Sequence, residues 1–311
     1  MSAALRLPPQ RTTQRGVAFV LVLWVIAMLS ILLGSFSLIA RTENLQARHL
    51  FDTTRARYAA EAGLNVAIFQ LRKADPLERW IGDGRPYTFG YDEARVEIRI
   101  TDDSGKIDIN ASAQPGNTDL LVNLFASNGL ALDRAEALAD AVVDWIDPDD
   151  LKQPNGAEVD DYHAAGLSYG PKNAPFDTVS ELQQVLGMNY ALYSRLEPAL
   201  TIYSGRGAPN VMNAPLEALM ALPDMTAECA AQIIQQRQAA VPGEPVAGGQ
   251  ELCAGVTLGM AGGGGLTYSV ESRATLPNGA STTLEATVRM GGINAAGRPY
   301  VILRWRDGET S

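Results

Sequence analysis

The chain of 311 residues is long enough to bury a core of its own and to form about two domains. Its composition is that of an ordinary globular protein, which excludes a disordered or collagen-like chain, and its formal net charge is −10. Removing the first sixteen residues, which hold three arginines and no acid, would leave a charge of −13. A body that acidic repels phosphate backbones, so the charge argues against nucleic acid as a partner and favours a divalent cation.

The first predicted element is an apolar run from Val17 to Ala40 that carries no charged side chain. Its 24 residues exceed the roughly 20 that a helix needs to cross the hydrocarbon core of a membrane. Three arginines, Arg6, Arg11 and Arg15, precede the run, and positive charge is retained on the cytoplasmic side. We therefore expect residues 17–40 to be a single transmembrane segment with the rest of the chain outside the cytoplasm.

A cleaved signal peptide is the main alternative for this segment. The run is longer than a typical signal-peptide core, and no small-x-small site closes it before Arg41. The junction Gln14-Arg15-Gly16-Val17 instead resembles the cleavage site of type IV prepilins and pseudopilins. That resemblance implies a leader over residues 1–16, which a prepilin peptidase removes after Gly16. Val17 then becomes an N-methylated N-terminus, and the apolar segment stays in the bacterial inner membrane.

The helix is predicted to continue to Arg72, because apolar or small residues recur near helical spacing from Leu45 to Leu71. Asp75-Pro76 is a plausible stop. At ~1.5 Å per residue, a helix from Val17 to Arg72 would be about 84 Å long. Its first half is apolar on all sides and its second half is amphipathic, as expected of a helix that leaves a membrane and packs on a globular head.

The remaining chain predicts a small antiparallel sheet whose strands come from opposite ends of the sequence. Alternating apolar residues and flanking turn residues mark these strands. The predicted segments are Ala94–Thr101, Ile107–Ile109, Thr267–Thr275, Thr282–Met290 and Arg298–Arg306.

Between these strands, residues 113–258 have mainly helical patterns. The predicted helices are Leu120–Ala126, Arg134–Ile146, Val179–Leu186, Tyr190–Leu196, Pro215–Leu222 and Ala227–Gln238. The fold class is therefore α+β: a long N-terminal helix on a small antiparallel sheet, with a large inserted helical domain. We place the domains at residues 41–112, 113–258 and 259–311. The glycine run Gly262–Gly265 lacks the Lys-Ser/Thr of a phosphate loop, so it is interpreted as a linker.

The two cysteines, Cys229 and Cys253, allow either one disulfide or two buried thiols. A disulfide requires an oxidising compartment such as the periplasm. The predicted export of the head therefore favours the disulfide.

A dense acidic cluster lies in the inserted domain. Four aspartates fall within seven residues, and three further acids follow after a turn: Asp144, Asp147, Asp149, Asp150, Glu158, Asp160 and Asp161. Hard oxygen ligands that converge from two loops are typical of Ca²⁺ sites. The spacing is not that of an EF-hand, and a solvated acidic loop is the alternative on spacing alone.

Several stretches, taken in order along the chain, together resemble the K-type minor pseudopilins of the type II secretion system, the general secretion pathway K family. They are Gly16-Val17, Gly105–Asn110, Asp144–Asp150, Asn155–Glu158 with Asp160 and Asp161, Val179–Leu182 and Asn210–Pro215. Each stretch is modest alone, whereas their ordered combination is specific and covers nearly the whole chain.

This resemblance implies a pseudopilin fold and a complex with the I-type and J-type minor pseudopilins at the filament tip. Inner-membrane secretion components would be further partners, and the head would lie in the periplasm. The resemblance also implies structural calcium. We expect its ligands to be Asp147, Asp149 and Glu158, with Asp161 or Asp160. Val159 stands where the family often has an acid.

Position five of the predicted mature chain is Leu21. In shaft subunits of the filaments that the chain resembles, this residue is usually a glutamate that pairs with a neighbour's N-terminal amine. A leucine cannot form that pair, so this subunit needs no subunit above it to neutralise a buried charge. A bulky insertion would also obstruct stacking in a shaft but not at a tip. The alternative is that Leu21 is merely a good membrane residue.

An enzyme is not expected, and we assign no catalytic residue. His49 and His163 are the only histidines, and no catalytic nucleophile, zinc or phosphate-loop motif occurs. Residues 213–233 resemble a helix–hairpin–helix, which we interpret as a packing module. A DNA-uptake receptor built on that module and a minor pilin of a type IV pilus are the alternative functions.

Overall fold

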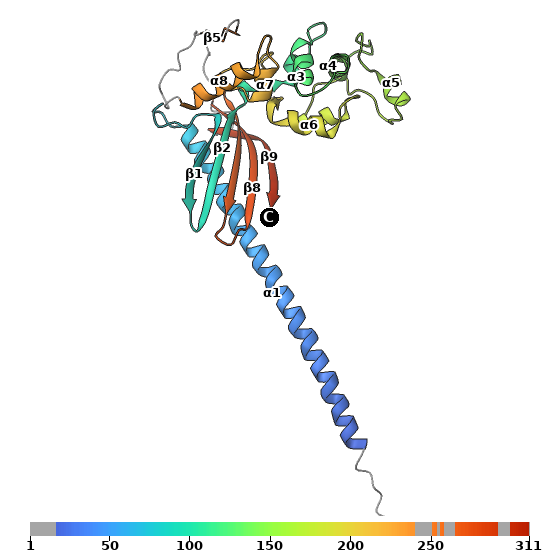
Figure 1. The fold of residues 1–311 in the computed structure, drawn as a ribbon, viewed down its shortest axis with the longest axis vertical. Helices are drawn as coiled ribbons and strands as arrows, with labels where there is room; N and C mark the ends of the chain where they lie inside the picture. The colour runs from blue at the N-terminus through green and yellow to red at the C-terminus, as the bar shows by residue number, and fades with distance from the viewer. Residues whose placement is uncertain (1–16, 240–250, 254–255, 258–264, 292–298, 311) are drawn as a thin grey trace, which may run out of the picture. The chain divides into compact units, whose positions relative to one another are not determined.

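A computed structural model describes residues 17–239, 251–253, 256–257, 265–291 and 299–310 (Figure 1). The predicted leader, residues 1–16, lies outside the described residues, as do Gly262–Gly264 of the predicted linker. The chain divides into two units at Arg55, and the second unit, Ala56–Ser311, contains both hydrophobic cores.

The N-terminal helix α1 spans Val17–Leu71 without a break. Its apolar side chains from Phe19 to Ile39 are exposed. The hydroxyls of Ser30 and Ser35 donate to carbonyls four residues earlier, at 2.8 and 2.9 Å. These two hydroxyls therefore have internal partners, as apolar surroundings require. Length and composition make this helix suitable for crossing a membrane.

The second unit is built on a five-stranded sheet with the order β1-β2-β7-β8-β9, in which every neighbouring pair is antiparallel (Figure 1). The strands are β1 (Asp83–Tyr91), β2 (Ala94–Asp102), β7 (Thr267–Thr275), β8 (Ser281–Met290) and β9 (Tyr300–Thr310). Strands β2 and β7 are neighbours, so the sheet combines strands that precede the insertion with strands that follow it. The α+β class with a long N-terminal helix is thereby confirmed.

One face of the sheet packs against the C-terminal part of α1. Small residues of the helix, including Ala56 and Ala60, lie on Val96, Ile98 and neighbouring apolar residues of the strands. At Gly63 the helix lies so close to the sheet that an added Cβ would collide with the side chains of Ser272 and Val96. Close approach rather than bulky side chains therefore fixes the helix on the sheet.

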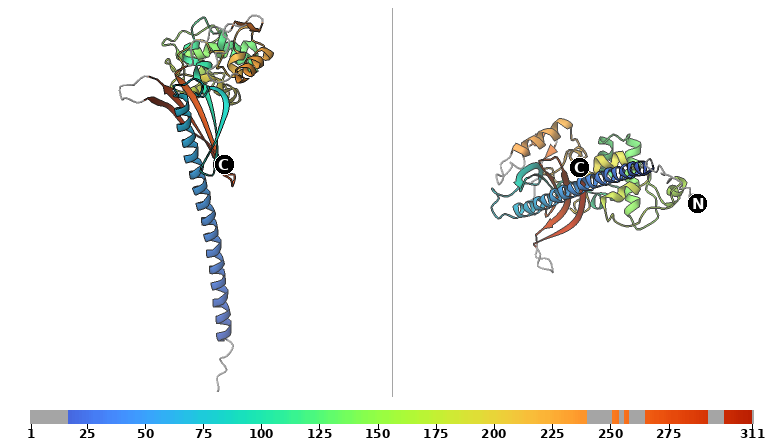
Figure 2. Two further views of the ribbon diagram at one scale, coloured as in Figure 1. Left: turned by 90° about the vertical axis from the view of Figure 1, so that its left-hand side faces the viewer. Right: turned by 90° about the horizontal axis from the view of Figure 1, so that it is seen from below.

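The insertion between β2 and β7 has a core of its own, made by short helices. Figure 2 shows these helices gathered at one end of the strands. They are α2 (Ile109–Ser112), α3 (Asp119–Ser127), α4 (Leu132–Ile146), α5 (Val159–Ala164), α6 (Tyr190–Leu196), α7 (Leu216–Met220) and α8 (Ala227–Ala239). Short 3₁₀ turns and strands link them: η1 (Asp103–Gly105), η2 (Val179–Gln184), η3 (Glu197–Ala199), β3 (Ile107–Asp108), β4 (Leu200–Thr201), β5 (Glu251–Cys253) and β6 (Val256–Thr257).

Several elements differ from the sequence prediction. Ile107–Ile109 is not a strand of the large sheet: β3 pairs in parallel with β4, and Ile107 packs in the core of the insertion. The strand ends because the Asp108 carboxylate accepts hydrogen bonds from the N–H groups of Asn110 and Ala111 and so begins α2. Strand β1 was not predicted, since Gly84, Pro86 and Gly90 interrupt its alternation. Residues 179–184 form a 3₁₀ turn rather than an α-helix.

The two ends of the insertion meet at Asp102, the last residue of β2. One carboxylate oxygen accepts from the N–H of Ser104 at 2.8 Å, and the other accepts from the N–H of Gly265 at 2.7 Å. Burial raises the pKa of this carboxyl, while these hydrogen bonds oppose the rise. The chain thus leaves and re-enters the sheet at one buried side chain.

Candidate functional site

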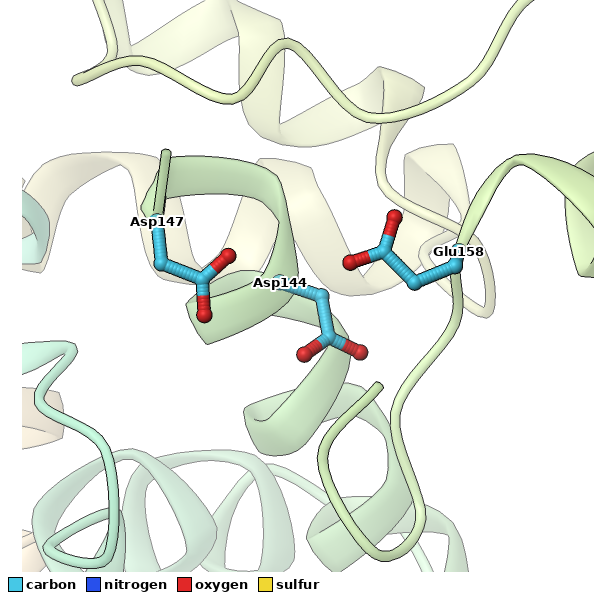
Figure 3. A group of neighbouring side chains, drawn as sticks. All are labelled: Asp144, Asp147 and Glu158. Carbon is cyan, nitrogen blue, oxygen red and sulfur yellow. The ribbon is translucent and has the colours of Figure 1, made fainter. Parts of the chain in front are cut away.

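Three carboxylates of the insertion lie together at the end of α4. Asp144 is in the last turn of α4, Asp147 follows it directly, and Glu158 is the N-cap of α5. One ligand atom from each lies within 4.8 Å of the others, and this is the one such group among the residues that the structure describes. Figure 3 shows the carboxylates of Asp147 and Glu158 turned toward one another, with Asp144 between them.

The loop between α4 and α5 is wrapped around Asp144. One of its carboxylate oxygens accepts from the N–H of Gln153 at 2.9 Å, and the other accepts from the N–H of Ala157 at 2.7 Å. At Gly156 an added Cβ would collide with the Asp144 carboxylate, so only glycine allows this close approach. Because Asp144 is fully buried, the loop depends on it for these backbone hydrogen bonds.

Glu158 is the residue that most needs a further partner. Its side chain is 9% exposed, and neither carboxylate oxygen has a hydrogen-bond partner. Burial, and after it the charges of Asp144, Asp147 and Asp150, together raise the pKa of Glu158 to about 7. The pKa of Asp147 is raised for the same reasons, burial first, and its Oδ1 also lacks a partner.

These residues fit a hard cation by their chemistry. Three buried acceptor oxygens without donors, held beside a further carboxylate, are costly unless positive charge compensates them. Ca²⁺ takes six to eight oxygen ligands, including carboxylates that bind through one or two oxygens. The group supplies such oxygens from two segments of the chain.

The other predicted ligands are engaged elsewhere. Asp161 contacts Lys152 Nζ at 2.8 Å and accepts from the N–H of Glu158 at 3.0 Å. The hydrogen bond from Lys152 is the main cause of its lowered pKa. Asp149 Oδ1 accepts from the N–H of Leu151, and Asp160 is exposed. The structure thus brings Asp147 and Glu158 together, and the roles of Asp149, Asp160 and Asp161 as ligands stay predictions.

Asp144 belongs to the acidic cluster in sequence but was not among the expected ligands. A signal for its role was present, because Asp144 and Asp147 are three residues apart at the end of a predicted helix. Residues at that spacing lie on one face of a helix. The Asp147-Pro148-Asp149 turn instead favoured ligands in the loop over a ligand in the helix before it.

Aromatic side chains form the wall behind the acidic group. Trp145 stacks on Phe176, and their ring centroids are 6.0 Å apart. The ring centroids of Trp145 and Tyr162 are 6.3 Å apart, with the rings tilted. Tyr162 is fully buried and donates nothing to the carboxylates; its hydroxyl accepts from the N–H of Leu186. This apolar wall limits solvent around the acids, which strengthens their interaction with a cation.

The processing site and the cysteine pair are only partly within the described residues. Gly16 lies outside them, and Val17 is the first residue of α1, with its side chain not described. Cys229 on α8 is buried and disulfide-bonded. Cys253 belongs to β5, but its side chain lies outside the described residues, so the pairing of the two cysteines stays a prediction.

The segment that resembles a helix–hairpin–helix packs into the core of the insertion. Ala218 and Leu219 of α7 and Ile233 of α8 are buried there. Arg237 is also buried, and its Nη1 donates to the carbonyl of Ala214 at 2.6 Å. These contacts support the interpretation as a packing module.

Comparison with known proteins gives a consistent result. A family model described as "Type II secretion system (T2SS), protein K" matches residues 100–205. A type II secretion system protein K of Klebsiella pneumoniae is 29% identical over 203 residues, which cover 60% of this chain and 61% of that protein. The protein of the same name from Pectobacterium carotovorum subsp. carotovorum is 28% identical over 253 residues, 73% of this chain and 76% of the relative. The alignment thus spans less than two thirds of the Klebsiella protein and about three quarters of the Pectobacterium protein.

A chain in the crystal structure of the GspK-GspI-GspJ complex from the type 2 secretion system of enterotoxigenic Escherichia coli has the same fold. The TM-score is 0.58 at 21% identity, and the match covers 87% of this chain and 99% of that chain.

Proposed function

We propose that this chain is a member of the type II secretion system protein K family and acts as a minor pseudopilin at the tip of the secretion pseudopilus. There it would help to initiate or cap the filament that drives export of folded proteins across the outer membrane. The observation that carries the proposal is the exposed apolar run of α1 on the same chain as a pseudopilin-type head. The proposed role is structural and involves no enzymatic step.

The N-terminal segment supports assembly beside similar helices. Phe19, Leu21 and Trp24 are each more than 60% exposed, and no charge interrupts the run up to Arg41. Exposed apolar surface of this extent needs lipid or other apolar helices as its surroundings. We infer that the segment anchors the precursor in the inner membrane, with the head in the periplasm, and later packs beside the corresponding helices of sister subunits.

The tip location rests on two features of this chain. Leu21 offers no carboxylate to a neighbouring subunit's N-terminal amine, as position five of the predicted mature chain would in a shaft subunit. The insertion adds more than 160 residues between β2 and β7. The matched complex contains GspK, GspI and GspJ, and we propose that this chain likewise assembles with I-type and J-type minor pseudopilins.

Processing and assembly can be tested with one pair of glycine variants. Gly16→Val changes the proposed cleavage junction, whereas Gly34→Val changes a glycine inside the apolar run where an added Cβ meets nothing within 4 Å. We expect Gly16→Val to remain uncleaved and to restore no protein secretion to a strain that lacks the gene. Gly34→Val should be cleaved before Val17 and should restore secretion.

Mass spectrometry of the N-terminus, assay of exported proteins in the medium and co-purification with the I-type and J-type subunits provide the readouts. A mature N-terminus beyond Arg41 would contradict the proposal. Loss of pilus retraction with intact secretion would instead support the type IV minor pilin.

We also propose that Asp144, Asp147 and Glu158 hold a structural Ca²⁺. The ion would supply positive charge to the three partnerless oxygens and would connect the end of α4 to the start of α5. Because it would bind only the folded insertion, it would stabilise the folded state. Further ligands can come from backbone carbonyls of the connecting loop.

Direct titration of calcium into the full-length protein in detergent micelles tests this ligand set. We expect Glu158→Gln to weaken binding by at least about tenfold, since it removes a buried charge from the site. Asp160→Asn is the matched control, because this exposed acid lies two residues away and outside the group. If Asp160→Asn weakened binding as much as Glu158→Gln, the set derived from the sequence would be the better one.

A further inference from the structure

A second concave surface lies where the insertion joins the ends of β7 and β8. It is a cavity of about 420 Å³ that shares no residue with the acidic group. Its polar lining comes from η1, from the loop after β4 and from the two strands: Ser104, Tyr203, Ser204, Arg206, Thr267 and Arg289. The lining therefore combines two guanidinium groups with four hydroxyls.

The charge of this pocket is unusual for an acidic protein. Among the described residues that line it, none is an aspartate or a glutamate. Within the described part of the chain, neither Arg206 nor Arg289 has a carboxylate within 4.0 Å. Neighbouring cations, in contrast, are each paired with an acid: Arg99, Lys106, Arg304 and Arg306. Two positive charges thus converge on a cavity without a compensating anion from its walls.

The guanidinium of Arg289 is held in place by two neutral partners. Its Nη2 donates to the carbonyl of Tyr203 at 3.0 Å, and its Nε donates to Thr267 Oγ1 at 3.3 Å. A guanidinium has five N–H donors in a fixed plane, so three remain for a ligand. The remaining N–H groups of Arg289 can therefore donate to an acceptor with two oxygens.

Two carboxylates that accept hydrogen bonds from residues of the lining, Asp102 and Asp108, are already engaged by donors of the protein. Asp108 accepts from the N–H groups of Asn110 and Gly205 and from the hydroxyl of Ser204. Asp102 accepts from two backbone N–H groups at the junction described above. These acids fix the loops that carry the pocket, and their oxygens accept from backbone N–H groups and the Ser204 hydroxyl rather than from the arginines.

We propose that this pocket binds a single carboxylate group presented by an acidic side chain of another polypeptide. Guanidinium groups bind planar carboxylates through paired hydrogen bonds, and the hydroxyls of Tyr203 and Thr267 supply further donors. A long polyanion is disfavoured, because the net charge of −10 would repel its other charges. Leu266, which also lines the pocket and is 63% exposed, offers contact to an apolar neighbour of the carboxylate. The proposal goes beyond the filament function and does not depend on the calcium site.

The test uses the full-length chain in detergent micelles and two capped tetrapeptides, Gly-Leu-Glu-Gly and Gly-Leu-Gln-Gly, in calorimetric titrations. We expect the glutamate peptide to bind about tenfold more tightly than the glutamine peptide, because only it offers a charged acceptor. Arg206→Gln and Arg289→Gln should each weaken its binding by about tenfold. Arg273→Gln is the matched control: this exposed arginine of β7 lies outside the pocket, so its variant should bind as the unchanged chain does.

Equal binding of the two peptides, or unchanged binding by both pocket variants, would overturn the proposal. Acetate in place of the peptide separates the sources: if acetate bound as tightly as the glutamate peptide, a free small carboxylate and not a polypeptide would be the ligand. Urea unfolding checks that each variant is folded. Arg206→Gln decides the outcome if Arg289→Gln is unstable, since within the described residues the Arg206 side chain makes no hydrogen bond.

Discussion

The five-stranded sheet with the part of α1 that packs on it, called the sheet unit below, and the insertion are stabilised in different ways. The sheet unit combines long strands with an alanine-rich helix face, and its core is formed by regular alternation of apolar residues. The insertion has helices of 4 to 15 residues, and several of its loops depend on buried carboxylates that accept backbone N–H groups. The stability of the sheet unit therefore depends mainly on packing geometry, whereas the stability of the insertion depends mainly on buried charge and hydrogen bonding.

The largest effect is expected at Asp144, the fully buried acid of the insertion. Asp144→Ala would leave the N–H groups of Gln153 and Ala157 without acceptors, and we expect a loss of about 3 kcal/mol in the free energy of unfolding. Urea unfolding in the presence of a chelator measures this loss without the contribution of a metal. Asp140→Ala is the control, because half-buried Asp140 accepts only from the N–H of Asn155 in the same loop. Equal losses for the two variants would show that burial of Asp144 is not what matters.

Removal of calcium should have the next largest effect, and it should be confined to the insertion. At a free calcium concentration 100 times the dissociation constant, binding adds about 2.7 kcal/mol to the stability of the folded state. Hydrogen exchange with and without chelator should therefore show loss of protection around Asp144 and Glu158. Strands β2 and β7 should be unaffected, and uniform loss across both regions would contradict this division.

In the sheet unit, the corresponding test is geometric. Gly63→Ala places a methyl group against Ser272 and Val96, and overpacking of this kind costs about 2 kcal/mol. Gly90→Ala is the control, because an added Cβ meets nothing within 4 Å at that position. Thermal unfolding of both variants tests the prediction, which is wrong if the two melting temperatures fall equally.

The smallest effect is expected where the two regions meet. Glu197 of the insertion lies 3.2 Å from Arg304 Nη2 and 2.9 Å from Arg306 Nη1 of β9. Because the arginines are partly exposed, Glu197→Gln should cost only about 0.5 kcal/mol, and less at high salt. Urea unfolding at two ionic strengths measures it, with Glu97→Gln as a control for an ion pair within one strand. A loss that is independent of salt would mean that the charge of Glu197 is not the cause.

Much of the sheet unit could be predicted from sequence because its patterns are regular. Val96, Ile98 and Ile100 alternate with polar residues, and β7 has the bounds that its pattern predicts. In β1 the pattern fails, since two glycines and a proline replace apolar residues. The apolar run of α1 likewise predicts an uninterrupted helix without reference to other elements.

The acidic group was harder to predict, because its members are selected by three-dimensional packing. Sequence density identified two segments that the fold brings together, with Asp147 and Glu158 in them. It could not show that Asp161 would pair with Lys152, nor that Asp144 would face Glu158. The arginine pocket gave no sequence signal at all, since Arg206 and Arg289 are 83 residues apart and converge only through the fold.

The junction at Asp102 has a consequence for the order in which the head folds. Strand β2 can pair with β7 only after the ends of a connection of 164 residues have come together. Closing a loop of that length costs about 2.5 kcal/mol more in entropy than closing a loop of ten residues. If the insertion folds first, its own core brings Ser104 and Gly265 to the same carboxylate, and the effective loop becomes short. The insertion would then act as an internal template for the sheet, so mutations that weaken it should slow formation of a sheet they do not touch.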